Sequence, residues 1–170
     1  MRYISVNEFS TFGVHDSEVV SLNVGNDAVV CELESIDVAM ANSLNDQPTD
    51  MQAEPVRVTI EGFKVEKLAH CGLETWEDGK PVTLPPGSFA PEEYGDCLKS
   101  LQEDIGLHNL FLYSGEALEP DGKRLRAFID LGFQNVTFSY ERLTVEWERF
   151  AKKAWYVDFN KQHGDSQEMG

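Results

Sequence analysis

The chain has 170 residues, of which 41% are hydrophobic and 11% aromatic, enough apolar material for one folded domain. Its formal net charge of −16 disfavours DNA, RNA and anionic lipid as partners, because all of these are polyanions. No segment reaches the roughly 20 apolar residues that a membrane-spanning helix needs, and the first residues lack the apolar core of a secretion signal. We therefore expect one cytoplasmic domain over residues 1–160 and a flexible tail over residues 161–170.

The negative charge is concentrated in the first part of the chain. Residues 1–120 hold 22 acidic and 6 basic side chains, whereas residues 121–160 hold 6 and 7. A field of this sign accelerates encounter with a cationic protein surface. The alternative interpretation is that the acidity only maintains solubility.

The sequence contains none of the common signatures of cofactor or metal binding. It has no phosphate-binding loop, no G-x-G-x-x-G, no G-x-S-x-G and no H-E-x-x-H. The three cysteines, Cys31, Cys71 and Cys97, are irregularly spaced, which fits neither a disulfide framework nor a paired zinc site. We expect reduced thiols, no cofactor and no bound metal. These absences favour a binding protein over an enzyme but leave an unfamiliar enzyme open.

The first predicted hairpin covers residues 18–33. Val20, Leu22 and Val24 alternate with polar residues, which is typical of a strand with one buried face. The Gly-Asn-Asp sequence at residues 25–27 tolerates positive φ and is expected to turn the chain back. In the returning strand the apolar positions are Val29, Cys31 and Leu33, and the solvent-facing ones are Glu32 and Glu34.

The parity of the apolar positions changes three times along the predicted strands. After Ser35 the apolar set becomes Ile36, Val38 and Met40, and a second change falls at Gly62. At both points we predict a β-bulge, because one inserted residue moves the following side chains to the opposite face. The third change follows Arg142, after which the apolar positions are Leu143, Val145 and Trp147.

Two segments between the predicted strands read as loops. Residues 41–54 are polar, contain Pro48 and lack periodicity, which predicts a mobile loop. Residues 72–90 contain so many glycines and prolines that a long regular element is excluded.

One helix is predicted over residues 91–105. Pro91 suits the first helical position, the two glutamates that follow complement the helix dipole, and Gly106 ends the helix. Its apolar face consists of Tyr94, Cys97, Leu98, Leu101 and Ile105.

The rest of the chain is predicted to be mainly strands. They cover residues 107–113, 125–131, 136–140 and 143–147, with a hairpin turn at Asp121-Gly122, while residues 150–159 fit either a strand or a helical turn. Together these elements predict an α+β, mostly β fold: an antiparallel sheet, curved or split into two layers by β-bulges, with one amphipathic helix.

Three titratable residues, His15, Asp16 and Glu18, lie just before the first predicted strand. On an extended chain His15 and Asp16 point to opposite sides, so they form no common metal site without a turn. A structural turn with His15 as a hydrogen-bonded anchor is the simplest interpretation. Contact with a partner, catalysis and metal binding stay open as alternatives.

The segment at residues 12–18, an aromatic followed by His-Asp-Ser-Glu and a hairpin, resembles small bacterial immunity proteins of polymorphic toxin systems. Val145-Glu146-Trp147 and Trp155-Tyr156 are similar to the end of such chains. Here Val14 stands where that family commonly has an aromatic directly before His-Asp. The resemblance implies a non-enzymatic protein that occupies the active or binding site of its toxin, often a basic nuclease.

We therefore expect a cytoplasmic protein that binds a basic protein partner, for which the resemblance implies a toxin, and not a nucleic acid or a membrane. The expected contact residues are His15, Asp16, Glu18, Glu32, Glu34, Asp37, Glu61 and Glu66. One alternative is a small enzyme or ligand carrier with a pocket framed by His15, Asp16, His70 and the tryptophans Trp76, Trp147 and Trp155. Another is a scaffold with an exposed apolar patch on the outer sheet face.

Overall fold

The computed structural model describes residues 1–14, 17–104, 116–118, 124–131 and 134–158. It confirms a mostly β fold with antiparallel sheets and one α-helix. The strand predicted at residues 107–113, the turn at residues 121–122 and the tail at residues 161–170 lie outside the described residues. Within the described part, no helix is both long and apolar enough to cross a membrane.

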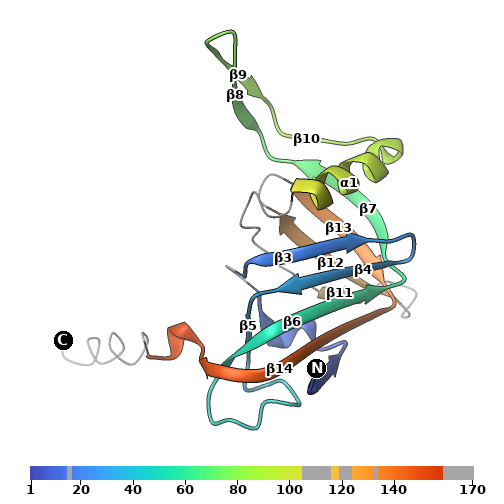
Figure 1. Cartoon of the computed structure of the whole chain (residues 1–170). Helices are drawn as coiled ribbons and strands as arrows, with labels where there is room; N and C mark the ends of the chain where they lie inside the picture. The colour runs from blue at the N-terminus through green and yellow to red at the C-terminus, as the bar shows by residue number, and fades with distance from the viewer. Residues whose placement is uncertain (15–16, 105–115, 119–123, 132–133, 159–170) are drawn as a thin grey trace, which may run out of the picture.

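The strands form two larger sheets and one separate hairpin (Figure 1). The first sheet has the order β1 (Tyr3–Val6), β14 (Arg142–Lys153), β6 (Met51–Glu61), β4 (Ala28–Leu33) and β3 (Val19–Val24), with β5 (Ile36–Val38) also beside β6 and β2 (Phe12–Gly13) beside β5. The second sheet has the order β10 (Gly87–Ser88), β7 (Lys64–His70), β13 (Gln134–Tyr140), β12 (Leu125–Leu131) and β11 (Glu116–Leu118). The hairpin consists of β8 (Leu73–Glu77) and β9 (Lys80–Leu84).

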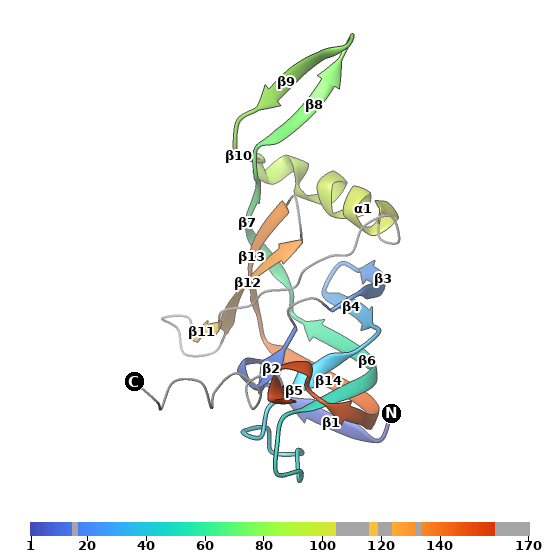
Figure 2. The same ribbon diagram turned by 90° about the vertical axis from the view of Figure 1, so that its left-hand side faces the viewer.

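The two larger sheets enclose a common core. The largest fully buried side chains come from both sheets and are Trp147, Tyr140, Phe138, Leu33, Ile36, Leu68 and Leu143. Aromatic contacts run through this core, with Trp147 stacked on Tyr3 at 5.1 Å between ring centroids. The sheets therefore form two layers, as Figure 2 shows from the side.

Two strands pass from the first sheet into the second and bend at the same place. β6 continues into β7 through Gly62, and β13 continues into β14 through Glu141. Gly62 has φ +64, and a Cβ there would lie 2.8 Å from Cγ of Glu141. The parity changes at Gly62 and near Arg142 thus mark a change of sheet, so the prediction of a bulge at Gly62 is wrong.

The pairing between these two strands keeps its register across the bend. Ser139 faces Lys64 in the second sheet, and Arg142 faces Glu61 in the first, which leaves two residues on each strand between the pairs. The Glu141 N–H donates to the carbonyl of Glu61 at 3.0 Å, so the hydrogen bonding continues into the bend. One antiparallel ladder therefore connects the two layers.

A similar continuity explains the parity change near Ser35. Leu33 faces Val56 and Ile36 faces Ala53, so β4 and β5 pair with β6 in one register. The gap between them lies opposite Pro55, which has no N–H to donate to the ladder. The sequence change therefore marks a break between two strands and not a bulge.

The register shifts that the structure does contain lie elsewhere. In β3 the pairing with β4 shifts between Val19 and Ser21. As a result Val19 is buried and Val20 is 58% exposed, which contradicts the prediction that Val20 faces inward. Met40 is also 58% exposed, because β5 ends at Val38. Further shifts occur in β13 between residues 137 and 138 and in β14 between residues 150 and 152.

The loop predicted at residues 41–54 is shorter in the structure, since β6 begins at Met51. Asn42 is buried and donates to the Thr11 hydroxyl at 2.8 Å, and Asn45 donates to the Val38 carbonyl at 3.0 Å. These amide side chains satisfy backbone and hydroxyl groups that an irregular segment would otherwise leave unpaired.

The helix α1 (Tyr94–Asp104) follows a 3₁₀ turn at Pro91–Glu93 and covers the edge of the first sheet (Figure 1). Leu101 is buried, and Tyr94 and Cys97 pack against the core. The Gln102 side chain accepts a hydrogen bond from the Val24 N–H at 2.9 Å. The helix thereby shields part of an edge strand that would otherwise be open to another chain.

The end of the described chain combines both alternatives left open for residues 150–159. β14 continues to Lys153, and residues 155–158 form a single helical turn. The turn is attached to the loop before β6, because the Ala154 N–H donates to the Asp50 carbonyl at 3.0 Å.

Candidate acidic site

Three of the predicted contact carboxylates are neutralised by arginines on nearby strands. Glu32 pairs with Arg57 at 2.9 Å and Glu61 with Arg142 at 3.6 Å, in both cases directly across two neighbouring strands. Glu66 of β7 accepts a hydrogen bond from Nε of Arg126 at 2.7 Å. The hydrogen bond from Arg57 also lowers the pKa of Glu32. The sheet faces around these residues are therefore of mixed charge, unlike the acidic face expected from the sequence.

Asp37, one of the predicted contact residues, does not lie on a solvent-facing surface, so its contact with a partner stays a prediction. Its side chain is only 9% exposed, because β5 is flanked by both β2 and β6. Gly13 lies opposite Asp37, and a Cβ at Gly13 would be 3.3 Å from the Asp37 Cβ. Alternation along β5 predicts that Asp37 faces solvent, but all three residues of this strand are buried.

The charge of the Asp37 carboxyl group is only partly compensated. Among the described residues, no group makes a hydrogen bond to its Oδ1 atom. Burial and the nearby charge of Asp50 raise its pKa to about 6, with partial opposition from Lys152. A carboxyl group in this state can hold or release a proton near neutral pH.

Asp50, which lies near Asp37, connects its own segment by hydrogen bonds to the segments of Met40 and Tyr156. Its carboxylate accepts hydrogen bonds from the Met40 N–H at 2.7 Å and from the Tyr156 hydroxyl at 2.8 Å. Burial and this hydrogen bond raise the pKa of Tyr156. Neither Asp50 nor Tyr156 was predicted from the sequence, because Asp50 lies in the predicted loop at residues 41–54 and Tyr156 in the segment 150–159, which fits either a strand or a helical turn. Neither residue type nor spacing indicated that they would meet.

Glu18 and Glu34 are brought together on the surface. The Glu34 N–H donates to the Glu18 carbonyl at 3.0 Å, and both residues are exposed. Neither carboxylate forms an ion pair within the described part of the chain. Three peptide units separate Glu34 from Asp37, a span of at most about 11 Å. We call Glu18, Glu34, Asp37 and Asp50 the acidic junction.

The segment that precedes the junction runs through residues 12–18. Phe12 and Gly13 form β2 beside β5, Val14 and Ser17 are buried, and the Ser17 N–H donates to the Val14 carbonyl at 3.2 Å. His15 and Asp16 lie outside the described residues, so their predicted role stays a prediction.

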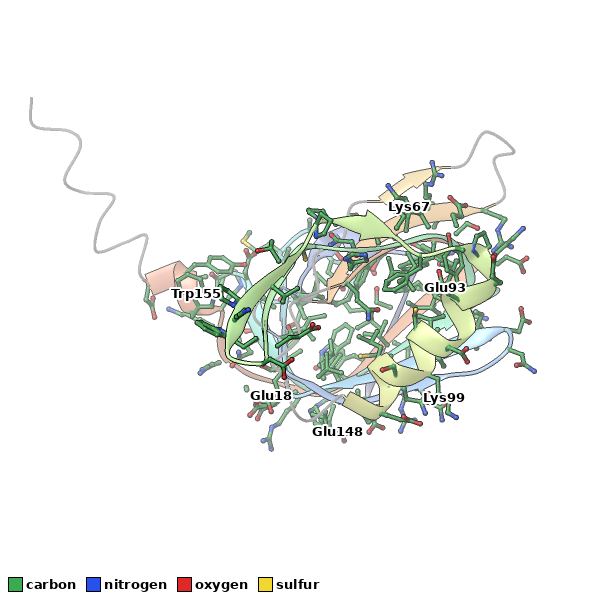
Figure 3. All side chains as sticks on the ribbon, turned by 90° about the horizontal axis from the view of Figure 1, so that it is seen from above. Glu18, Lys67, Glu93, Lys99, Glu148 and Trp155 are labelled. Atoms are coloured by element: carbon green, nitrogen blue, oxygen red, sulfur yellow. The ribbon has the colours of Figure 1, made fainter. Side chains whose placement is uncertain are left out.

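The residues of the alternative pocket lie in separate parts of the molecule. Trp147 is fully buried, whereas Trp76 in β8 is 71% exposed and Trp155 in the terminal turn is 63% exposed. The ring of His70 packs against Phe89, with 5.2 Å between ring centroids. Seen from above, Trp155 lies at the end of the molecule away from α1, which carries Lys99 (Figure 3). The described residues of this set do not converge on one cavity.

The described residues give little support to metal or thiol chemistry. No group of three or more His, Cys, Asp or Glu side chains in this part of the protein could hold a metal ion. Burial raises the pKa of Cys31 to about 12, which keeps this thiol protonated at neutral pH.

Exposed apolar side chains of the first sheet, among the described residues, lie on both of its edge strands. Ile4 and Val6 lie on β1, and Val20 lies on β3. These strands form opposite ends of the first sheet's strand order, so three intervening strands separate Val20 from Ile4 and Val6.

No protein-family model matches the sequence, and neither the curated proteins nor the solved structures contain a significant match.

Proposed function

We propose that this protein is a non-enzymatic binding protein that recognises a basic protein partner through the acidic junction. The observation that carries the proposal is the distribution of paired and unpaired charge. Four arginines on the strands form ion pairs with glutamates of the same protein: Arg57 with Glu32, Arg126 with Glu66, Arg142 with Glu61 and Arg149 with Glu54. Glu18 and Glu34 remain exposed and free of such pairs in the described chain, beside the buried Asp37.

A cationic partner would gain from this arrangement in two ways. Exposed carboxylates steer an oppositely charged surface during encounter, which raises the association rate at low ionic strength. The net charge of −16 also attracts a cationic partner at longer range.

We extend the proposal to a toxin as the partner, which would make the protein a toxin-neutralising immunity protein. The support is the resemblance of residues 12–18, a segment whose first part pairs with β5 in the acidic junction. A basic nuclease would present the cationic phosphate-binding groups that such a surface fits.

The test measures association kinetics with the protein encoded by the adjacent reading frame, as the first candidate partner. We expect an association rate that falls steeply with added salt and falls again in a Glu18→Gln/Glu34→Gln variant. The matched control is Glu32→Gln/Glu61→Gln, which changes the net charge by the same amount at carboxylates that are already paired. Equal effects of the two variants would exclude the acidic junction as the contact site. A rate independent of salt would exclude electrostatic recognition.

A further inference from the structure

The hairpin formed by β8 and β9 extends away from the body of the protein (Figures 1 and 2). Its base continues the pairing of β7 with β10 in the same register, since His70 faces Gly87 and Leu73 faces Leu84. The interruption between the two ladders contains Pro85 and Pro86, which have no N–H to donate. The hairpin is a separate two-stranded sheet that continues the ladder of β7 and β10 in the same register.

The base of this hairpin is firmly packed. The His70 ring lies over Gly87, where an added Cβ would be 2.7 Å from its Nε2 atom. The Phe89 N–H donates to the Leu68 carbonyl at 3.0 Å, next to the contact between the His70 and Phe89 rings. Rigid prolines and a packed base fix the direction in which the hairpin leaves the sheet.

The tip of the hairpin, in contrast, is exposed. Asp78 and Gly79 have φ of +50 and +72, as a tight type I′ turn requires. Trp76 lies opposite Pro81 and is 71% exposed, and Glu77 and Asp78 are exposed beside the turn. Two-stranded hairpins are marginally stable alone, and tryptophan is one of the residues enriched at the energetic centres of protein interfaces. An exposed tryptophan on an anchored hairpin therefore suits a contact with another molecule.

The charge of the hairpin indicates which class of molecule could contact its tip. The hairpin sequence over residues 73–84 has three acidic residues and one lysine, a net charge of −2. An anionic membrane, a nucleic acid and a second copy of this chain with its own −16 charge would all be repelled. A cationic protein surface is attracted, and an arginine side chain can stack on the indole ring through a cation–π contact.

We infer that the hairpin is a second contact arm, on which Trp76 receives an arginine side chain of a basic protein partner. The inference rests on the proposed function in one respect, the cationic nature of the partner. It adds a contact site that lies outside the acidic junction and comes from different strands. The carboxylates of Glu77 and Asp78 supply the local attraction, and Trp76 supplies the contact surface.

The experiment titrates the full-length protein with a synthetic arginine-rich peptide and follows the indole N–H signals by NMR. We expect the Trp76 signal, identified by its loss in a Trp76→Ala variant, to shift on binding while the Trp155 signal stays in place. The Trp76→Ala substitution should weaken binding roughly five-fold, the size expected for an exposed cation–π contact. Trp155→Ala is the matched control, because it removes a second exposed tryptophan, and it should change the affinity less than two-fold.

A further variant tests the charge without changing the hairpin. Glu77→Gln/Asp78→Asn keeps Trp76, and asparagine followed by glycine supports the same turn. It should weaken peptide binding and reduce its dependence on salt. Normal binding by Trp76→Ala, or equal losses in the Trp76→Ala and Trp155→Ala variants, would overturn the contact arm alone. Failure of the wild-type protein to bind the peptide would overturn both this inference and the proposed recognition of cationic partners.

Discussion

Replacing Asp37 with asparagine removes a carboxyl group that the fold keeps buried without full compensation. Its pKa of about 6 in the folded protein compares with the ordinary value of 3.8. At 1.36 kcal/mol for each pKa unit, the ionised form costs the folded state about 3 kcal/mol. This is an upper limit, because asparagine also needs hydrogen-bond partners and the attraction of Lys152 is lost.

The contribution of Asp37 to the free energy of unfolding depends on pH. A carboxyl group with a raised folded pKa keeps its proton in the native state while the unfolded chain releases it, so this group lowers stability as pH rises from about 4 to about 6. Above that range the cost is constant. Asp37→Asn should therefore unfold at higher urea concentration than wild type at about pH 8, with a smaller advantage at about pH 5.

The assay is urea unfolding of both proteins at the two pH values, followed by circular dichroism. Asp27→Asn serves as the control, since Asp27 is exposed in the turn between β3 and β4, where asparagine is equally suited. A stability difference between Asp37→Asn and wild type that is the same at both pH values would refute the reasoning. So would a variant that is less stable than wild type at about pH 8.

Two further substitutions test the bend between the sheets and the paired charges. Gly62→Ala should lower the free energy of unfolding by at least 1–2 kcal/mol, because Gly62 has positive φ and the new Cβ would collide with Glu141; a thermal-unfolding midpoint equal to that of wild type would contradict this. A double-mutant cycle with Glu32→Ala and Arg57→Ala should give a coupling energy below about 1 kcal/mol, since both partners are substantially exposed. A coupling energy of several kcal/mol would show that this pair stabilises the sheet far more than its exposure indicates.

Sequence patterns predicted strands where alternation marks one buried face, but they missed β8, β9 and β10 within the predicted loop at residues 72–90. Alternation placed Val29, Cys31 and Leu33 in the core, and the structure confirms all three. The same alternation placed Leu143, Val145 and Trp147 inside, and they are fully buried. These positions depend only on local periodicity, which the sequence contains in full.

The errors have a common physical origin in contacts between distant segments. A change of parity at Gly62 looks identical in sequence whether the strand bulges or crosses into another sheet. The crossing depends on a partner strand almost eighty residues away, where Glu141 packs against Gly62. The burial of Asp37 likewise depends on a neighbouring strand on each side of β5, which alternation within β5 cannot reveal.

The candidate site was predictable only in part. The sequence identified Glu18 and Glu34 as exposed carboxylates, but it also selected Glu32 and Glu61, whose arginine partners follow from strand register. Register between strands distant in sequence is set by turns and packing, so residue composition cannot distinguish a paired from an unpaired carboxylate.

The ladder through both layers also affects how the chain acquires its fold during synthesis. β6 and β7 are complete by His70, but their partners β13 and β14 begin only at Gln134. Until then the ribosome-bound chain holds an unpaired strand edge, and closure of the core must await contacts of large sequence separation. Nascent chains of this protein are thus vulnerable to aggregation for much of their translation. During this period the repulsion between their negative charges opposes aggregation.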